Sequence, residues 1–515
     1  MFVRYLLSGL SDGFHTGIQN HLQIETYTVK NLVSAGKDPV TISQLLDKEV
    51  HDNYWIGPYV EAPFDVYRIN PIGVVQHKYN LKKRLIVDMS APHDNAMYPS
   101  VNDLIDKNEF SLTYVKIDDA INIIKELGQG SWLCKVDVKS AFKNLPIHPS
   151  LWRFHGIQWK NQMFFATRLV FGSRSSPKIF DCLAQAIEWI ASTNYGIKHI
   201  LHLLDDFLTI EHPDSDPDRN MALLSHIFNK LGVPLANHKT VGPVNRLEYL
   251  GIILDTCKME ACLPLDKKER IVDLLNQFTQ KRTCLKRELL SLIGHLVFAS
   301  RVVIPGRTFI SRLIEASKKV KHLHHRVTLT KDSKEDIEMW GYLLSHWNGI
   351  SLFLDKQLTI ADDLHLFTDA SGSLGFAGYF QGAWFASAWD KEMLASVEGE
   401  LSIAFQELYP IVVAAILWGK SWKRKQIVFH CDNMSVVQIL NKGRSPCLAI
   451  MRLMRRLVIV AALCNFNFRS IHVAGYKNQI ADSLSRLNFQ KFKQLAPEAA
   501  QHPCSVPPHH MIMFH

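Results

Sequence analysis

The sequence predicts a multidomain protein of the α+β class. Its 515 residues correspond to about three domains of ordinary size. Hydrophobic residues make up 47% of the chain, as in globular proteins and unlike disordered ones. Short apolar runs that end on carboxylates predict strands, and longer runs with apolar residues at helical spacing predict helices. The two kinds of run alternate along the chain, so strands and helices are expected within the same domains.

Two adjacent carboxylates, Asp205 and Asp206, lie between the apolar runs 200–204 and 207–210. Runs of this length bounded by polar residues predict two strands joined by a turn. Like charges at such a turn repel each other, and a divalent cation such as Mg²⁺, which prefers carboxylate oxygen, relieves the repulsion. A solvated Asp-Asp turn is the alternative interpretation, because Asp is common in turns.

Two further segments precede this turn. Residues 132–138 predict a strand that ends on a carboxylate, Asp137, and Phe142 follows five residues later. A Gly-Ser-Pro loop over 172–177 leads into an amphipathic helix over 180–191, and its small residues allow the backbone to approach a substrate closely. This order resembles motifs A, B and C in the palm of reverse transcriptases. The resemblance implies a right-hand polymerase with fingers, palm and thumb.

Shorter segments extend the resemblance. Lys83 and Arg84 resemble the fingers strand that grips the incoming triphosphate, and Lys239 resembles the motif D lysine near the leaving pyrophosphate. Each segment has a plainer alternative, such as a solvated edge or an ordinary strand end. The implied nucleotide-binding residues are Lys83, Arg84, Phe142, Phe171, Gly172 and Lys239, and the implied primer grip is Tyr249, Leu250 and Gly251.

Two of these positions carry a specific expectation. Phe142 is expected under the sugar of the nucleotide, where it excludes a 2′-hydroxyl and favours deoxynucleotides. Phe171 departs from the retroviral enzymes, which carry Gln there, although other retroelements also have Phe.

Positive charge is concentrated in one part of the chain. The net charge is +9, and residues 260–331 hold 15 Lys and Arg against 6 Asp and Glu. A concentrated basic surface suggests a polyanion partner, and a solvated helical face is the alternative. Two runs of this segment have apolar residues at helical spacing, Ile271, Leu274, Leu275 and Phe278, then Leu289, Ile293, Leu296 and Val297. In the resembled family this segment is the thumb.

A second group of acids follows from about residue 361. Residues 364–369, 376–380, 383–389, 426–430 and 466–473 predict strands, and 400–418 and a segment from 479 predict helices. This order resembles an α/β ribonuclease H domain. The resemblance implies four metal-binding acids, Asp369, Glu407, Asp432 and Asp482, and a His that assists product release, His472. A lone His after a strand ordinarily has a structural role.

The two resemblances together imply two-metal phosphoryl transfer at two sites, with two Mg²⁺ per site, or Mn²⁺ in their place. Asp137 and Asp205 are the expected metal bridges in the palm, and Asp206 supports them. The implied partners are an RNA template, a DNA primer, an RNA/DNA hybrid and dNTPs, and the 2′-hydroxyl marks the strand to be cut. The oligomeric state is not predicted.

The chain is most similar to DIRS-type, tyrosine-recombinase retrotransposons. Five short segments carry that similarity: 90–92, 100–103, 171–172, 203–208 and 481–486. We find no aspartic-protease motif, zinc knuckle, recombinase or integrase segment, which suggests part of a polyprotein or a degenerate copy. Two alternatives remain for the function, a catalytically inactive nucleic-acid-binding relic and a DNA-templated polymerase of related palm.

The expected domains are an N-terminal extension (1–53), fingers and palm (54–256), a basic helical thumb (257–330), a connection (331–360), a ribonuclease H-like domain (361–487) and a disordered tail (488–515). The nine Cys show no zinc spacing and suggest free thiols in a reducing compartment. No signal peptide is apparent, and the longest apolar stretches are too short to cross a bilayer. We therefore expect an intracellular protein, in the cytoplasm or nucleus, without a membrane partner.

Overall fold

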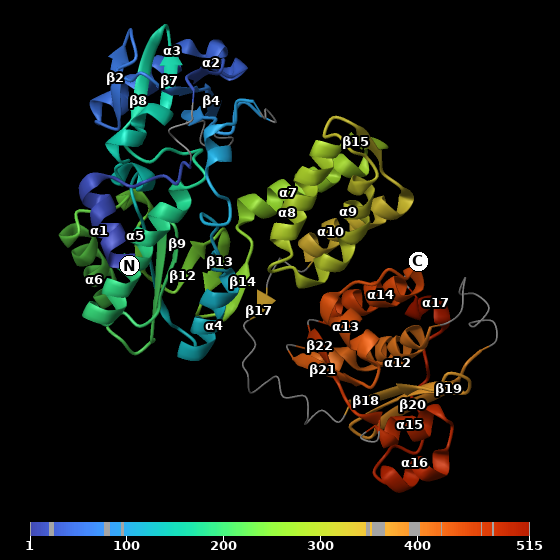
Figure 1. Cartoon of the computed structure of the whole chain (residues 1–515). Helices are drawn as coiled ribbons and strands as arrows, with labels where there is room; N and C mark the ends of the chain where they lie inside the picture. The colour runs from blue at the N-terminus through green and yellow to red at the C-terminus, as the bar shows by residue number, and fades with distance from the viewer. Residues whose placement is uncertain are drawn as a thin grey trace. The chain divides into compact units, whose positions relative to one another are not determined.

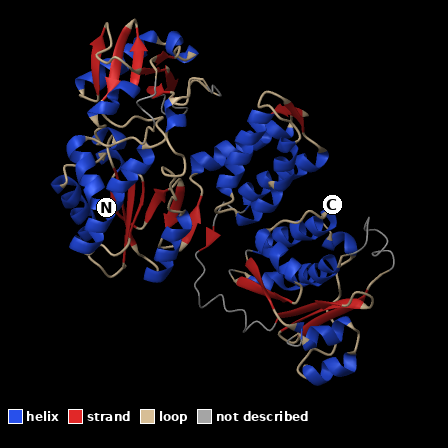
Figure 2. Cartoon of the chain, viewed as in Figure 1, coloured by secondary structure: helices blue, strands red, loops and turns tan. Residues whose placement is uncertain are grey.

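The structure is a computed structural model that describes residues 2–19, 25–76, 83–93, 97–346, 351–352, 366–390, 402–423, 425–464, 466–475 and 478–513. It divides into two compact units, Met1–Tyr249 and Leu250–His515 (Figure 1). Helices and strands alternate within both units (Figure 2), which confirms the predicted α+β class.

A four-stranded sheet forms the palm of the first unit, with its strands in the order β11-β6-β10-β9. These strands are β6 (Trp132–Asp137), β9 (Ile200–Leu203), β10 (Asp206–Glu211) and β11 (Val241–Val244). The predicted strand before Asp137 and the predicted hairpin are thus confirmed. Three helices pack on the sheet: α4 (Ile117–Leu127), α5 (Ser176–Tyr195) and α6 (Asp218–Lys230). Helix α5 begins with Pro177 in its first turn and ends at the left-handed Gly196, a combination typical of helix ends.

The rest of the first unit holds a second sheet, in the order β1-β3-β7-β8-β2, and a separate β4-β5 hairpin. Their bounds are β1 (Tyr27–Thr28), β2 (Trp55–Tyr59), β3 (Arg68–Asn70), β4 (Ile72–Gln76), β5 (Lys83–Val87), β7 (Gly156–Trp159) and β8 (Gln162–Ala166). The N-terminal helices are α1 (Phe2–Asp12), α2 (Val33–Lys37) and α3 (Pro39–His51). Their buried residues, such as Leu6 and Ile42, share one core with Phe207 of the palm, so residues 1–53 are not a separate extension.

A bundle of four helices forms the first part of the second unit: α7 (Leu265–Thr279), α8 (Lys286–Ala299), α9 (Ser311–Lys318) and α10 (Lys331–His346). A short ladder of β15 (Thr283–Leu285) and β16 (Arg326–Thr328) joins the bundle. Helix α10 packs on α7, so residues 331–346 belong to the bundle and not to a separate connection. The rest of the predicted connection, apart from residues 351–352, lies outside the described residues.

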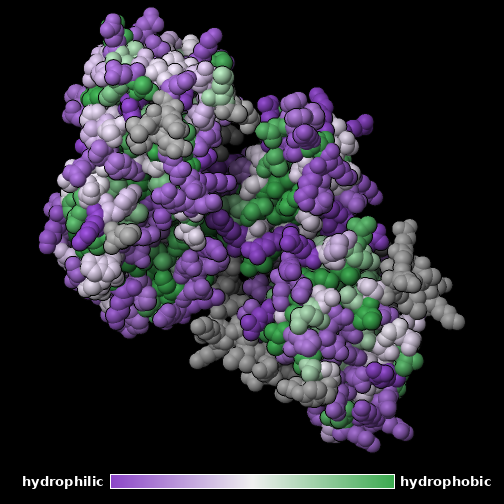
Figure 3. Space-filling model, in the orientation of Figure 1, coloured by the Kyte–Doolittle hydropathy of each residue, from purple (hydrophilic) through white to green (hydrophobic). Residues whose placement is uncertain are grey.

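The bundle also exposes apolar surface. Val297, predicted to lie on the buried face, is 49% exposed, and Leu290, seven residues earlier on the same face of α8, is 39% exposed. Figure 3 shows a patch of apolar side chains over α7 and α8 on a surface that is otherwise mostly hydrophilic.

The second part of this unit contains an antiparallel sheet of β18 (Leu366–Ala370), β19 (Gly375–Phe380) and β20 (Ala383–Ala388), and a parallel pair, β21 (Gln426–Cys431) and β22 (Asn467–His472). Helices α12 (Ile403–Trp418), α13 (Met434–Lys442) and α14 (Leu448–Cys464) cover one face, and α15 (Gln479–Ser485) and α16 (Phe489–Leu495) cover the other (Figure 1). Alternate strand residues serve the two faces, because Phe376 packs in one core and Ala377 in the other.

The C-terminal tail is ordered, which contradicts the predicted disorder. Phe492 of α16 is 1% exposed, and Ile512 of α17 (His509–Ile512) is fully buried. Between them the chain runs beside the edge strand β20, where Trp384 donates from its indole to the carbonyl of Ala500 and Cys504 donates to the carbonyl of Trp384. The apolar residues of the tail are too few for a sequence pattern, yet Phe492 and Ile512 each fill a place in a core built by distant residues.

Removal of one tail side chain tests this role. Phe492→Ala is expected to lower the free energy of unfolding by about 3–4 kcal/mol, because a large buried ring is lost and a cavity remains. Phe489→Ala, on the same helix but 41% exposed, is the matched control and should cost less than half as much. Urea unfolding followed by Trp fluorescence measures both. Equal small losses would mean that the tail does not contribute to the core.

One helical segment, Ile403–Trp422, is long and apolar enough to cross a membrane by length and composition, so the prediction that all apolar stretches are too short was wrong. Of the most apolar 18-residue stretch of this segment, 72% is buried inside the protein. Glu407 and Pro410 lie within it. The segment is therefore the central helix of a folded core.

Candidate active sites

Three carboxylates gather at one end of the palm sheet. The antiparallel pairing of β10 with β6 places Asp206 directly opposite Asp137, and side chains at opposite positions lie on the same face. Asp205 occupies the turn before β10, where Leu204 has a φ of 53°. The backbone N–H of Val138 donates to the carbonyl of Asp205 at 2.9 Å and fixes this turn on the end of β6. The fold thus brings together all three predicted palm acids.

The environment of these acids disfavours their negative charge. Burial, and then the neighbouring charge of Asp137, raises the pKa of Asp205. Burial likewise raises the pKa of Asp206 to about 6, where Asp137 and Asp205 add to the rise and Lys135 and Lys239 oppose it. Lys239 lies with its Nζ 2.7 Å from Oδ2 of Asp137. A half-buried cluster of like charges that already draws a cationic side chain fits a site for divalent cations.

The ligating atoms of the three palm acids do not all lie within 4.8 Å of one another. In the described part of the chain, a single group of three potential ligands has its ligating atoms within 4.8 Å of one another, and this group lies in the second unit. The ammonium group of Lys239 instead neutralises Asp137, as expected of the nearest cation in a site of low dielectric.

The loop before α5 is held by a residue whose role the sequence analysis missed. Asn102 is 5% exposed and donates from its amide to the carbonyl of Gly172 at 2.8 Å and to Oγ of Ser90 at 2.9 Å. Its side-chain oxygen accepts from the backbone N–H of Arg174 at 2.8 Å. Asn102 therefore ties the loop 172–174 to a distant segment. The sequence placed Asn102 in a recognised motif but gave no sign of these partners.

Gly172 has a φ of 106°, and a Cβ on it would come within 2.3 Å of the carbonyl oxygen of Val87. Only glycine fits there, because the loop runs against the end of β5, the strand that carries Arg84. Gly172 thus allows the loop to approach the protein's own backbone, and this contact joins two of the predicted nucleotide-binding segments.

Two aromatic rings form a platform beside this loop. Phe142 is 7% exposed, and the ring of Phe171 lies over it with centroids 4.6 Å apart. Phe180 of α5 supports Phe142 from another side at 5.9 Å. Phe171 itself is 57% exposed. The exposed ring is thus Phe171, and Phe142 is the buried ring beneath it.

The two basic residues of β5 have different surroundings. Adjacent strand residues point to opposite faces, so Lys83 and Arg84 cannot face the same ligand from a regular strand. Lys83 forms an ion pair with Asp38 at 2.5 Å, and this contact lowers the pKa of Asp38. Arg84 is exposed. Both predicted triphosphate ligands thus lie at the surface, and Lys83 would have to leave Asp38 to bind a phosphate.

The three predicted primer-grip residues form a strand end and a turn. Tyr249, the last residue of β12 (Arg246–Tyr249), is fully buried, and burial raises its pKa. Leu250 and Gly251 follow as a tight turn with φ of 49° and 79°.

A buried charged cluster supports the hairpin that carries Asp205 and Asp206. His202 of β9 lies between two acids of α5, with Nδ1 2.5 Å from Glu188 and Nε2 3.3 Å from Asp181. Burial alone lowers the pKa of His202, but hydrogen bonds and charges from Asp181 and Glu188 outweigh it and raise the pKa to about 9. Protonated His202 therefore clamps β9 to α5.

This clamp predicts a pH-dependent contribution to stability. The folded-state pKa lies above the unfolded value, so the stabilisation is fully present below about pH 6.5 and is lost as the pH rises through about 9. From the difference between the two pKa values, protonated His202 contributes at most about 3 kcal/mol to the free energy of unfolding. The difference in unfolding free energy between wild type and His202→Asn should shrink from pH 6 to pH 9.5. A difference that stays constant over this range would contradict the clamp.

The second site collects four acids from four elements. Asp369 lies on β18, Glu407 on α12, Asp432 directly after β21 and Asp482 on α15. Burial, and then Asp369 and Asp432, raises the pKa of Glu407 to about 9. Burial, opposed by a hydrogen bond from Ser485 and reinforced by Asp432 and Asp482, raises the pKa of Asp369 to about 6. These mutual effects place all four predicted acids in one electrostatic cluster, which suits divalent cations.

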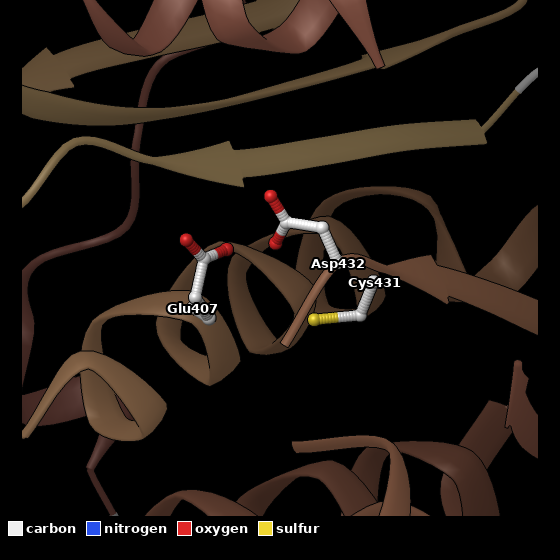
Figure 4. Close-up of side chains that lie close together, drawn as sticks. All are labelled: Glu407, Cys431 and Asp432. Atoms are coloured by element: carbon white, nitrogen blue, oxygen red, sulfur yellow. The ribbon is translucent and has the colours of Figure 1, made fainter. Parts of the chain in front are cut away.

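Glu407, Cys431 and Asp432 form the one group with ligating atoms within 4.8 Å of one another among the described residues (Figure 4). The carboxylates of Glu407 and Asp432 face each other, and the Cys431 sulfur lies to one side. Cys431 is 3% exposed and packs in the hydrophobic core, and its sulfur accepts from the N–H of Asn433. We therefore assign the carboxylates to the site and Cys431 to the core.

Several neighbours orient the acids. Ser485 donates to Asp369 at 2.6 Å, and Arg486 pairs with Asp482 at 2.7 Å. Ser485 and Arg486 both lie within the segment 481–486 that the sequence singled out, but the carboxylates that they contact could not be inferred from it. His472, at the end of β22, contacts the carbonyl of Asp432 at 3.1 Å and is exposed. The predicted His thus lies beside the predicted acid.

Residues 65–254 match the family described as reverse transcriptase (RNA-dependent DNA polymerase). None of the curated proteins matches the chain in sequence. Among solved structures, the chain is similar to a foamy viral protease-reverse transcriptase dRH in complex with double-stranded DNA, with a TM-score of 0.52, 16% identity and coverage of 89% of this chain and 74% of that one. The chain is also similar to a foamy viral protease-reverse transcriptase in complex with an RNA/DNA hybrid. The TM-score is 0.51 and the identity 15%, and the match covers 89% of this chain and 56% of that one. These similarities confirm the predicted polymerase fold.

Proposed function

We propose that the chain, which contains a reverse transcriptase domain over residues 65–254, is an RNA-directed DNA polymerase that also cuts the RNA strand of the hybrid it makes. The observation that carries the proposal is the register of the palm sheet, which sets Asp206 opposite Asp137 with Asp205 in the adjoining turn. The electrostatic cluster of Asp369, Glu407, Asp432 and Asp482 supports the nuclease activity.

In the palm, Asp137, Asp205 and Asp206 would hold two Mg²⁺ ions, which supply activation of the primer 3′-hydroxyl and stabilisation of the leaving pyrophosphate. Arg84 is exposed to bind the triphosphate. Lys239, now paired with Asp137, is close enough to the acids to donate to a phosphate oxygen. The exposed ring of Phe171, which lies over Phe142, offers an apolar surface to the sugar, where a 2′-hydroxyl would lose hydrogen bonds with water.

In the second site, the four acids would hold the ions, and the remaining residues orient them. Ser485 fixes one oxygen of Asp369, and Arg486 fixes one of Asp482. His472 lies at the exposed side of Asp432, in a position to assist the departure of a cut strand.

The test is primer extension by the full chain, with Mg²⁺ and dNTPs, on an RNA template and on a DNA template of the same sequence. We expect extension on RNA, and cleavage of the RNA once it is in a hybrid. An absence of product on both templates would favour an inactive binding protein. Extension on DNA only, with intact RNA in the hybrid, would favour a DNA-templated polymerase.

We further propose that the chain comes from a DIRS-type retrotransposon. Support comes from residues 90–92 and 100–103, where Asn102 bonds to Ser90 and to the loop of Gly172. A tyrosine recombinase encoded in the flanking genomic sequence would bear this out, and an integrase of the retroviral kind would refute it.

A further inference from the structure

The turn at Leu250 and Gly251 has an unfavourable backbone conformation. It follows β12 and precedes β13 (Ile252–Asp255), and both residues have positive φ, 49° for Leu250 and 79° for Gly251. Glycine tolerates this region, but a leucine there is rare, because its Cβ crowds the backbone. Such a conformation persists when its surroundings hold it.

Helices α7 and α8 hold this turn. Lys267 of α7 donates from its ammonium group to the carbonyl of Gly251 at 3.0 Å. The same ammonium lies 5.4 Å from the ring centroid of Phe298 on α8. A Cβ on Gly251 would come within 2.6 Å of Lys267 Nζ and 3.0 Å of the Phe298 ring. The turn is therefore in direct contact with both side chains.

The cation over Phe298 is not an isolated contact. The Arg301 guanidinium also lies 5.4 Å from the centroid of the same ring. Two cations on one ring fix its position, because each is attracted by the ring's negative faces. The ring in turn limits where the Lys267 ammonium can lie, so the hydrogen bond to Gly251 is aimed by the helices.

We propose that Lys267 is a positioning residue that fastens the turn to the helical bundle, so that the turn and the bundle hold a primer-template duplex as one body. The inference rests on the proposed polymerase function, since it assigns the turn to the primer. Lys267 acts through the turn in this role and takes no part in the chemistry.

The experiment compares Lys267→Met, Lys267→Arg and a matched control, Lys268→Met, which removes the same charge from the next position of α7. The readouts are the dissociation rate of a DNA-primed RNA template in the presence of a heparin trap, the rate of a single nucleotide addition at saturating substrate, and the melting temperature. Gly251→Ala is the second variant, because its Cβ displaces the Lys267 ammonium.

We expect Lys267→Met to raise the dissociation rate about tenfold over Lys268→Met, as for loss of a hydrogen bond from a charged donor. Single nucleotide addition should change little, and Lys267→Arg should restore slow dissociation. Gly251→Ala with Lys267→Met should dissociate no faster than either alone, since both break one contact. Equal dissociation rates for Lys267→Met and Lys268→Met would overturn the inference, whereas a wild-type chain that extends no primer would overturn the proposed function itself.

Discussion

Asp205→Asn is expected to lower the rate of DNA synthesis by roughly 10³-fold, because a ligand that holds the ions contributes about 4 kcal/mol to the barrier. The carboxylate lies in the turn that Val138 fixes to β6, so Asn fits the same space without moving the backbone. Primer extension on an RNA template at saturating dNTP measures the effect. Cleavage of a preformed hybrid by the same variant should be unchanged.

Stability separates this loss from misfolding. Burial and Asp137 raise the pKa of Asp205, so its charged form is less favourable in the folded state than in the unfolded state. Above about pH 4 the charge therefore destabilises the protein, and Asp205→Asn should melt at the same temperature as wild type or higher. Asp214→Asn removes a carboxylate whose side chain is 90% exposed and should leave synthesis intact. Normal synthesis by Asp205→Asn would exclude this carboxylate as a ligand.

Asp432→Asn is expected to lower the rate of hybrid cleavage by roughly 10³-fold, while primer extension continues. Asp432 faces Glu407 with ligating atoms within 4.8 Å, so the amide of Asn replaces one of two carboxylates that could share an ion. The measurement is the rate at which an end-labelled RNA strand is cut in an RNA/DNA hybrid. Cleavage that survives in this variant would place the nuclease chemistry elsewhere.

Metal addition provides the control for this variant. The raised pKa of Glu407, about 9, means that its charged form is unfavourable in the fold, so stability falls as the pH rises from about 4.5 through 9. A divalent cation should reverse that loss, and Mg²⁺ should raise the melting temperature of wild type at pH 8. The rise in melting temperature should be smaller in Asp432→Asn than in wild type. In Asp390→Asn, where the carboxylate is exposed, it should equal that of wild type.

The sequence predicted several of the acids because they lie at or next to the end of an apolar run, whereas Glu407 and Asp482 lie within helices and were implied by the resemblance alone. Asp137 closes β6 and Asp432 follows β21, as the alternation of apolar residues indicated. Such patterns do not predict the register in which β10 pairs with β6, so the sequence did not reveal that Asp206 lies opposite Asp137. Register depends on partners that are distant in the chain.

The features that the sequence did not predict share one physical cause, which is contact between distant segments. Lys83 pairs with Asp38, which lies 45 residues away, and no local pattern indicates this ion pair. The tail was predicted to be disordered from its Pro and His content, but Phe492 fills a core built from β19 and β20. Residues 331–346 were assigned to the connection, and only the packing of α10 on α7 assigns them to the bundle.

The account depends on two separate acid clusters that serve two reactions. Its most direct test uses one RNA/DNA hybrid with a recessed DNA 3′ end and a different label on each strand, incubated with wild type, Asp205→Asn and Asp432→Asn. We predict that wild type extends the DNA and cuts the RNA, that Asp205→Asn only cuts, and that Asp432→Asn only extends. Loss of both activities in either folded variant, or loss of neither, would contradict the assignment of one reaction to each cluster.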